Sequence, residues 1–168
     1  MRKLVLLLIA ILICSLAFGC AAPTTPVPAQ QPPPPTPSTP PSSGVVTLDL
    51  FGFTTAKNWD ADPEIDGIEV EIWPKDAKDE VVRAPGTVSA KLWLQKSLFE
   101  SEKGELVQTW SGISIKKEDY GFIGGAKVRL EYSGFVPTEE QWGILEVTFT
   151  TLDGNSFTAR EKDIHLGE

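Results

Sequence analysis

The chain has 168 residues, of which 15 are Lys or Arg and 23 are Asp or Glu, so its formal net charge at pH 7 is −8. A surface with this charge repels phosphate groups, which argues against nucleic acid as a partner and leaves cations, basic partners and neutral ligands. The only two cysteines, at positions 14 and 20, lie near the start, so the rest of the chain has no thiol for a disulfide, a zinc site or a nucleophile.

Residues 1–19 are typical of an export signal. Two basic residues precede the apolar run LVLLLIAILI at 4–13, which is about half as long as a membrane-spanning helix. The sequence SLAFGC, which ends at Cys20, resembles the lipobox of bacterial lipoproteins. The resemblance implies cleavage before Cys20, lipidation of this residue, and a location outside the cytoplasm, anchored to the cell membrane or the outer membrane. The alternative is an uncleaved signal anchor.

Residues 20–44 predict a disordered linker that begins with the lipidated cysteine. The stretch 22–44 holds ten of the fourteen prolines and no charged residue. Because it cannot bury enough apolar surface to fold, we expect an extended spacer with about 3.1 Å per residue, on the order of 70 Å when stretched.

Residues 45–168 have the size of one domain with one core. LDGNS at 152–156 joins two alternating runs and is the strongest hairpin signal in the chain. Segments 94–104 and 137–142 are candidates for short helical turns. Alternation of apolar and polar residues predicts seven β-strands, at 45–53, 67–74, 87–94, 105–115, 126–133, 143–152 and 156–166.

Seven short strands separated by turns predict an all-β fold, a single antiparallel β-sandwich with one core between its two sheets. Strand parity gives the expected core as Ile68, Val70, Ile72, Val88, Ala90, Leu92, Leu94, Val128, Leu130, Tyr132, Leu145, Val147 and Phe149.

Residues 60–166 resemble uncharacterised secreted prokaryotic lipoproteins with an immunoglobulin-like or transthyretin-like sandwich. The resemblance is carried by DADPEIDGIEVEIWPKDA, GTVSAKLWL and TLDGNSFTAREKDIHL. It implies the architecture and no catalytic residue, because many unrelated functions use this kind of sandwich.

Four carboxylates stand at alternate positions before the second predicted strand, at Asp60, Asp62, Glu64 and Asp66. Hard oxygen ligands at this spacing, followed by Gly, are typical of calcium loops. Trp73 stands where an EF-hand loop needs a bidentate Glu, so the calcium hypothesis requires acids from another loop. The alternative is a solvated acidic turn that leads into the strand. No other cofactor is expected.

Trp73 and Trp93 fall by parity on the polar faces of their strands. If the two strands share a sheet, the indoles could form a stacking platform for a carbohydrate. The alternatives are that a loop, the segment 94–104 or the terminal strand covers them, that strand twist carries them into the core, or that they form a protein-interaction patch.

No catalytic constellation is visible in the sequence. The single histidine, His165, has Asp163 on the same side of its strand, but no Ser lies in a nucleophile-elbow pattern. The glycines of YGFIGGAK at 120–127 predict a turn. We therefore predict a non-catalytic surface lipoprotein, held on the membrane by its lipid, whose sandwich is a binding or structural module for a protein or polysaccharide partner at the cell envelope. Carbohydrate binding through Trp73 and Trp93, or calcium binding, is the alternative function.

Overall fold

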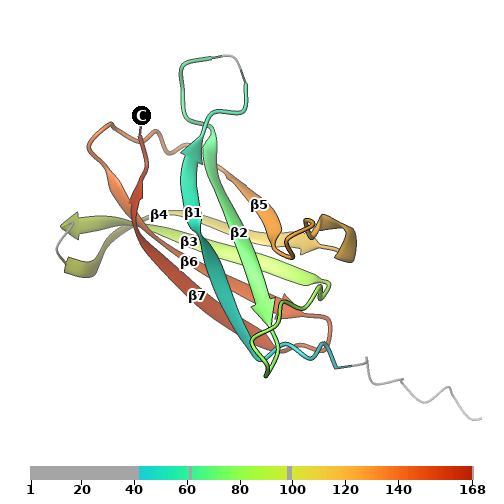
Figure 1. Ribbon diagram of the computed structural model, residues 1–168. Coiled ribbons are helices and arrows are strands. Elements are labelled where there is room, and N and C mark those ends of the chain that lie inside the picture. The colour runs from blue at the N-terminus through green and yellow to red at the C-terminus, as the bar shows by residue number, and fades with distance from the viewer. Residues whose placement is uncertain (1–41, 61, 98–99, 168) are drawn as a thin grey trace, which may run out of the picture. The chain divides into compact units, whose positions relative to one another are not determined.

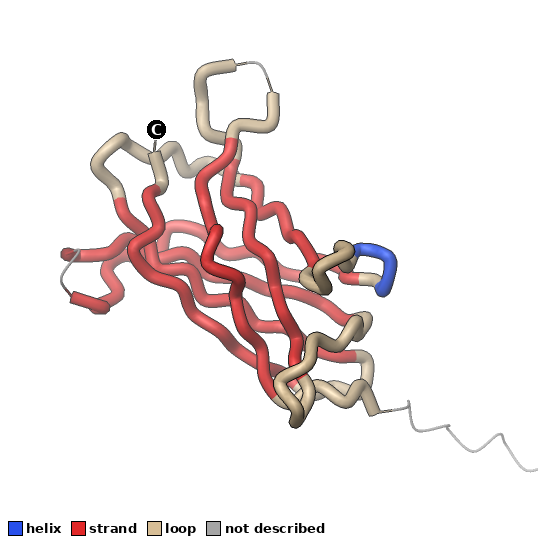
Figure 2. The backbone as a smooth tube through the Cα atoms, viewed as in Figure 1, coloured by secondary structure: helices blue, strands red, loops and turns tan. Residues whose placement is uncertain are grey.

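The computed structural model of the protein describes residues 42–167, apart from 61, 98 and 99. The predicted export signal and Cys20 therefore lie outside the described residues. Among the described residues, no helix is long and apolar enough to cross a bilayer. The elements, shown in Figures 1 and 2, are β1 (Thr47–Lys57), β2 (Gly67–Lys75), β3 (Gly86–Ser97), β4 (Glu100–Ile115), the 3₁₀ turn η1 (Lys117–Asp119), β5 (Ala126–Glu131), β6 (Trp142–Thr151) and β7 (Ser156–His165).

The strands form two antiparallel sheets packed as a sandwich, so the predicted all-β fold is confirmed. One sheet has the order β1-β2-β5 and the other has the order β4-β3-β6-β7. At one side of the sandwich β1 lies against β7. At the other side Trp110 of β4 donates its indole N–H to the carbonyl oxygen of Glu131 on β5, at 2.6 Å. These contacts tie the edges of the two sheets together.

The core lies where strand parity predicts it. All expected core positions are buried except Leu94 and Tyr132, which are partly buried and pack against the core. Leu48, Ile164 and Leu166 extend the core to the first and last parts of the domain. The alternation places an apolar side chain on the inner face at every second residue, and this is why seven short strands form one shared interior.

Both predicted helical turns are corrected by the structure. Segment 94–104 belongs instead to the hairpin of β3 and β4, with the pairs Gln95↔Lys103 and Ser97↔Glu100. Segment 137–142 contains a single turn, closed by the N–H of Gln141 and the carbonyl of Thr138 at 3.0 Å, after which β6 begins.

The loops gather at two ends of the sandwich. We call one the proximal end, because residues 42–46 lead into β1 there, and the other the distal end (Figure 1). The distal end holds the β1–β2 loop 58–66 and the β5–β6 loop 132–141. The proximal end holds the β2–β3 loop 76–85, the β4–β5 loop 116–125 and the β6–β7 turn 152–155.

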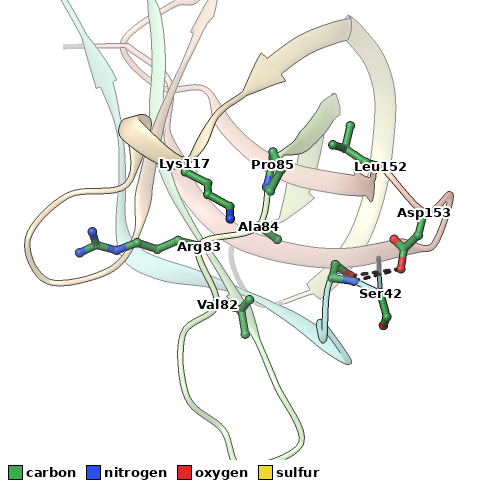
Figure 3. Close-up of a pocket in the computed structure, with 9 residues that line it drawn as sticks. Ser42, Val82, Arg83, Ala84, Pro85, Lys117, Leu152 and Asp153 are labelled. Carbon is green, nitrogen blue, oxygen red and sulfur yellow. Dashed lines mark hydrogen bonds between the residues drawn. The ribbon is translucent and has the colours of Figure 1, made fainter. Parts of the chain in front are cut away.

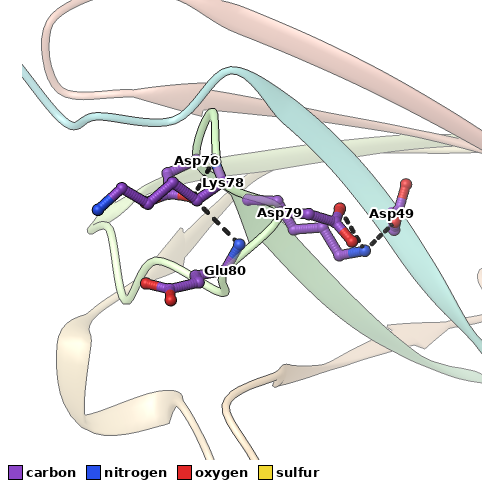
Figure 4. A network of polar contacts seen from close by, with 6 residues as sticks. Asp49, Asp76, Lys78, Asp79 and Glu80 are labelled. Carbon is purple, nitrogen blue, oxygen red and sulfur yellow. Dashed lines mark hydrogen bonds and ion pairs between the residues drawn. The ribbon is translucent and has the colours of Figure 1, made fainter.

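Charged side chains fix the β2–β3 loop at the proximal end (Figure 4). The Lys75 ammonium lies 2.7 Å from Asp49 and 2.9 Å from Asp79. The hydrogen bond to Asp49, and then that to Asp79, raises the pKa of Lys75. Asp76 accepts backbone N–H groups two and four residues further on, at 2.8 and 3.1 Å. The loop is therefore held both to its own strand and to β1.

Candidate binding surfaces

The acidic loop between β1 and β2 is built from side-chain turns. The backbone N–H of Asp60 bonds Asn58 Oδ1 at 3.1 Å, and the N–H groups of Asp62 and Glu64 bond Asp60 Oδ1 and Asp62 Oδ1, each at 2.9 Å. In each case a side-chain oxygen accepts the backbone N–H of the residue two positions later, which is the hydrogen bond of an Asx turn. Asp66 accepts the N–H of Trp59 across the loop.

This curl brings together three of the four predicted calcium ligands. Carboxylate oxygens of Asp60, Asp62 and Asp66 all lie within 4.8 Å of one another, whereas Glu64 is not part of the group. Asp60 and Asp62 are exposed and Asp66 is half-buried. Calcium takes 6–8 oxygen ligands, so three carboxylates would need carbonyl oxygens and water to complete the shell.

Trp73 lies on the outer face of the three-stranded sheet, where a neighbouring strand covers it. Its ring stacks on Phe51 of β1, with ring centroids 4.8 Å apart and an interplanar angle of 6°. Its indole N–H donates to Glu71 Oε1 at 3.0 Å. On the same side lies Gly125, where an added Cβ would be 2.6 Å from Glu71 Cγ and closer still to Trp73 Nε1. Trp73 thus forms the support for the β4–β5 loop.

Trp93 lies on the outer face of the four-stranded sheet. Lys103, which is within the segment 94–104, places its ammonium 3.6 Å from the centroid of the Trp93 ring. The same ammonium lies 2.8 Å from Glu146 Oε2. This hydrogen bond is the main reason why the pKa of Glu146 is lowered. The Lys103 ammonium therefore covers one face of the Trp93 ring, and Glu146 holds the ammonium there.

The structure does not bring Trp73 and Trp93 together. Trp73 belongs to β2 and Trp93 to β3, and these strands are in different sheets. The condition for a joint stacking platform, that both strands share a sheet, is therefore not met. Coverage by the segment 94–104, one of the predicted alternatives, describes Trp93, which Lys103 covers, whereas Trp73 is covered by Phe51 of the neighbouring strand β1.

His165 and Asp163 make separate contacts near the end of β7. The His165 ring lies 4.9 Å from that of Trp142, and its Nε2 is 2.5 Å from the carbonyl oxygen of Glu139. Asp163 is engaged by Gln95, which donates to Asp163 Oδ1 at 2.6 Å and accepts the Asp163 N–H at 2.9 Å. Both side chains thus connect β7 to neighbouring segments.

The most exposed apolar side chains of the described chain lie on a tight turn at the proximal end. Phe122 has a relative exposure of 102% and Ile123 one of 79%. They occupy the two central positions of a turn closed by the N–H of Gly124 and the carbonyl of Gly121, at 3.1 Å. Gly124 has φ = 113°, a conformation that glycine adopts without strain. We call residues 121–125 the apolar turn.

The base of the apolar turn is fixed on several sides. The Gly121 N–H bonds the Gly125 carbonyl at 2.8 Å, and Arg83 donates to the Gly121 carbonyl at 3.0 Å. The preceding residue, Tyr120, is buried and donates its hydroxyl to the Ala84 carbonyl at 2.7 Å. Burial, and then the neighbouring Asp119, raises the pKa of Tyr120 to about 12. The turn therefore presents Phe122 and Ile123 on a rigid support.

A cavity of about 300 Å³ lies at the same end (Figure 3). Arg83 and Lys117 are on its cationic side, and Asp153 is on the opposite side. Asp153 accepts the N–H of Ser43 at 3.2 Å, and the hydrogen bond from the Thr151 hydroxyl is the main cause of its lowered pKa. The cavity joins the residues that lead into β1 to the loops beside the apolar turn.

Sequence reasoning interpreted YGFIGGAK as an ordinary turn and missed its apolar tip. The available signal was the pair Phe122–Ile123 between glycines, since polar residues are usual at the centre of a turn.

The described chain is thus an all-β domain of two antiparallel sheets with an acidic loop at one end and an apolar turn at the other. No family model matches the chain, and comparisons with curated proteins and with solved structures found no match either.

Proposed function

We propose that the protein is a non-catalytic lipoprotein of the cell envelope whose sandwich binds another envelope component through the apolar turn. The observation that carries the proposal is the exposure of Phe122 and Ile123 on a turn with a fixed base. Full burial of such side chains stabilises a contact by about 1.5–3 kcal/mol each, whereas here they contribute nothing to the core. The export signal and the lipobox at Cys20 support the envelope location.

The immunoglobulin-like form of the sandwich is part of this proposal. Constant-type immunoglobulin domains have strands A, B, E and D in one sheet and C, F and G in the other. Lettered in chain order, β1, β2 and β5 correspond to A, B and E, while β3, β6 and β7 correspond to C, F and G. The fourth strand pairs with β3, so it has changed sheets relative to that pattern. Similar sandwiches serve as binding modules on cell surfaces.

A photo-crosslinking experiment in cells tests the binding function. The full chain would carry a benzophenone amino acid in place of Phe122 or, as a matched control, in place of Val136. Val136 is 73% exposed and lies in the distal β5–β6 loop. We expect adducts with an envelope protein or lipid from position 122 and far fewer from position 136. Equal yields from the two positions would remove the apolar turn as a binding surface.

Lipidation of Cys20 is tested in parallel by metabolic labelling. Metabolic labelling with a radioactive fatty acid should mark the full chain and should fail to mark Cys20→Ser. A labelled Cys20→Ser variant would show that this cysteine is not the anchor. Position 122 should then lose its envelope adducts in Cys20→Ser, because the domain is no longer tethered near its partner.

Calcium binding by the acidic loop is the second candidate function. The observation that favours it is the convergence of the Asp60, Asp62 and Asp66 carboxylates within 4.8 Å. A cation that binds only the folded state raises Tm by mass action, so millimolar calcium should raise Tm of the full chain. The rise should disappear in Asp60→Asn/Asp62→Asn and should remain in Glu64→Gln. An unchanged Tm of the unaltered chain in millimolar calcium would exclude calcium binding by the acidic loop.

A further inference from the structure

We propose that the apolar turn contacts the lipid bilayer that holds the protein, with Phe122 and Ile123 inserted at the boundary between headgroups and acyl chains. This inference rests on the proposed envelope function and names the partner as a membrane surface. The position of the turn, the chain that leads into β1 and the charges around the turn all favour this contact.

The turn and the incoming chain share one end of the sandwich. Ser42, at the start of the described residues, lines the proximal cavity beside Asp153, and Arg83, on the opposite side of the same cavity, donates to the carbonyl of Gly121 in the turn. The lipid predicted at Cys20 precedes Ser42 by 22 positions (42 minus 20). At about 3.1 Å per residue this tether spans at most about 70 Å, so the membrane lies within reach of the proximal end.

Other apolar side chains at the proximal end agree with this orientation. Val46, just before β1, is 54% exposed, and Leu152 in the β6–β7 turn is 69% exposed. Outside residues 42–46 and the proximal loops, the exposed large apolar side chains among the described residues are Val136 at 73%, Leu106 at 48% and Phe51 at 39%. Among the described residues, four of the seven exposed large apolar side chains, including the two most exposed, therefore lie where the tether joins the domain, and such concentrations mark interaction sites.

The charges near the turn identify the kind of bilayer contact. The proximal loops 76–85, 116–125 and 152–155 hold four basic residues, among them the Arg83 that contacts the turn, and six acidic residues, so their formal net charge is −2. The Asp119 carboxylate accepts the backbone N–H of Lys116 at 2.7 Å, so an acidic group lies beside Lys116 and Lys117. Attraction to anionic headgroups therefore contributes little, and the contact depends on apolar insertion. A zwitterionic membrane should be sufficient, and added salt should not weaken the contact.

Two inserted side chains bind a bilayer only weakly by themselves. The tether changes this, because a domain held near the surface re-encounters it at a high effective concentration. The hydrogen bonds at the base of the turn reduce the entropy cost further, since the backbone that carries Phe122 and Ile123 does not have to be ordered on binding. The combination gives a domain that docks reversibly on its own membrane.

Fluorescence in reconstituted vesicles tests the proposal with the full lipidated chain. An environment-sensitive dye would be attached at Ile123→Cys or, as the control, at Val136→Cys. With Cys20 carrying lipid, the introduced cysteine is the one available thiol of the processed chain. The vesicles would be phosphatidylcholine with a small share of lipid that carries a nitroxide quencher near the headgroup.

The expected result is a blue-shifted, strongly quenched dye at position 123 and an unquenched dye at position 136. Phe122→Ser should lower the ratio of docked to undocked domain by about tenfold, as expected from loss of most of the burial of one Phe side chain. A rise from about 50 to about 500 mM salt should leave the quenching unchanged. Phe122 is fully exposed, so Phe122→Ser should keep the Tm of the parent.

Equal quenching at the two positions, or quenching at 123 that ignores Phe122→Ser, would overturn the bilayer contact. So would energy transfer between copies labelled at 123 without lipid quenching, since it would identify a second copy as the occupant. If position 122 crosslinks to a protein in cells while vesicles give no quenching, the bilayer inference fails and the binding function stands. If both experiments are negative, both proposals fail.

Discussion

The fixed base of the apolar turn makes Gly125→Ala a sharp test of how the turn is held. The new methyl group would lie 2.6 Å from Glu71 Cγ and nearer still to Trp73 Nε1, where an ordinary contact is 3.4 Å or more. Glu71 can swing away, but the indole is stacked on Phe51, so relief requires Trp73 to leave both that stack and its hydrogen bond. Overpacking of this kind costs about 1–3 kcal/mol and the hydrogen bond about 1 kcal/mol.

We therefore expect Gly125→Ala to lower the free energy of unfolding by about 2–4 kcal/mol, which for a domain of this size lowers Tm by about 6–20 °C. Gly121→Ala is the matched control, because its methyl group would meet only the Gly125 carbonyl, at an ordinary 3.6 Å. Calorimetry on the full chain measures both. In a Trp73→Ala background the cost of Gly125→Ala should largely disappear, since the two sites are coupled. Equal Tm values for Gly125→Ala and Gly121→Ala would refute the reasoning.

Three further predictions concern the core, the alkaline stability and the indoles. Phe149→Ala removes a fully buried ring and should cost about 3–5 kcal/mol in urea unfolding; a loss below about 1 kcal/mol would contradict the described packing. The raised pKa of Tyr120, to about 12, means that its stabilisation is complete below pH 10 and is lost as the pH rises from 10 to 12. Tyr120→Phe should therefore be less stable at pH 8 and decline less steeply above pH 10, and parallel pH curves would count against this. An oligosaccharide panel should leave Trp fluorescence unchanged, because a phenyl ring covers Trp73 and an ammonium covers Trp93; quenching lost in either Trp→Ala variant would revive the carbohydrate prediction.

Most of the fold could be predicted because strand alternation is a local signal. Seven strands were expected, and the described residues form seven, each overlapping its expected range. The prediction failed where the pairing is irregular. From Leu92 to Ser97 the register of β3 against β4 shifts at every step, so the apolar pattern of segment 94–104 loses its period of two. A shift between Phe51 and Thr55 likewise hides the second half of β1.

The candidate sites depend on long-range placement, which alternation does not encode. The alternate spacing of Asp60, Asp62, Glu64 and Asp66 is local, and the structure brings three of the four carboxylates together, without Glu64. Parity placed Trp73 and Trp93 on the outer faces of their strands. It does not specify which strands pair, and the structure has β2 and β3 in different sheets. The exposure of Phe122 depends on the absence of any covering element in the described chain, and the pair Phe122–Ile123 between glycines was its one local signal.

The irregular pairing of the edge strands affects how copies of the protein meet at high local concentration. Each sheet has two edge strands, and an uninterrupted edge would invite a neighbouring molecule to add its own strand. Here β1, β4 and β7 all have register shifts, and β5 is only 6 residues long. Among the described residues a neighbouring copy therefore finds no long regular edge to extend, and we expect densely packed domains not to grow into fibres by strand addition.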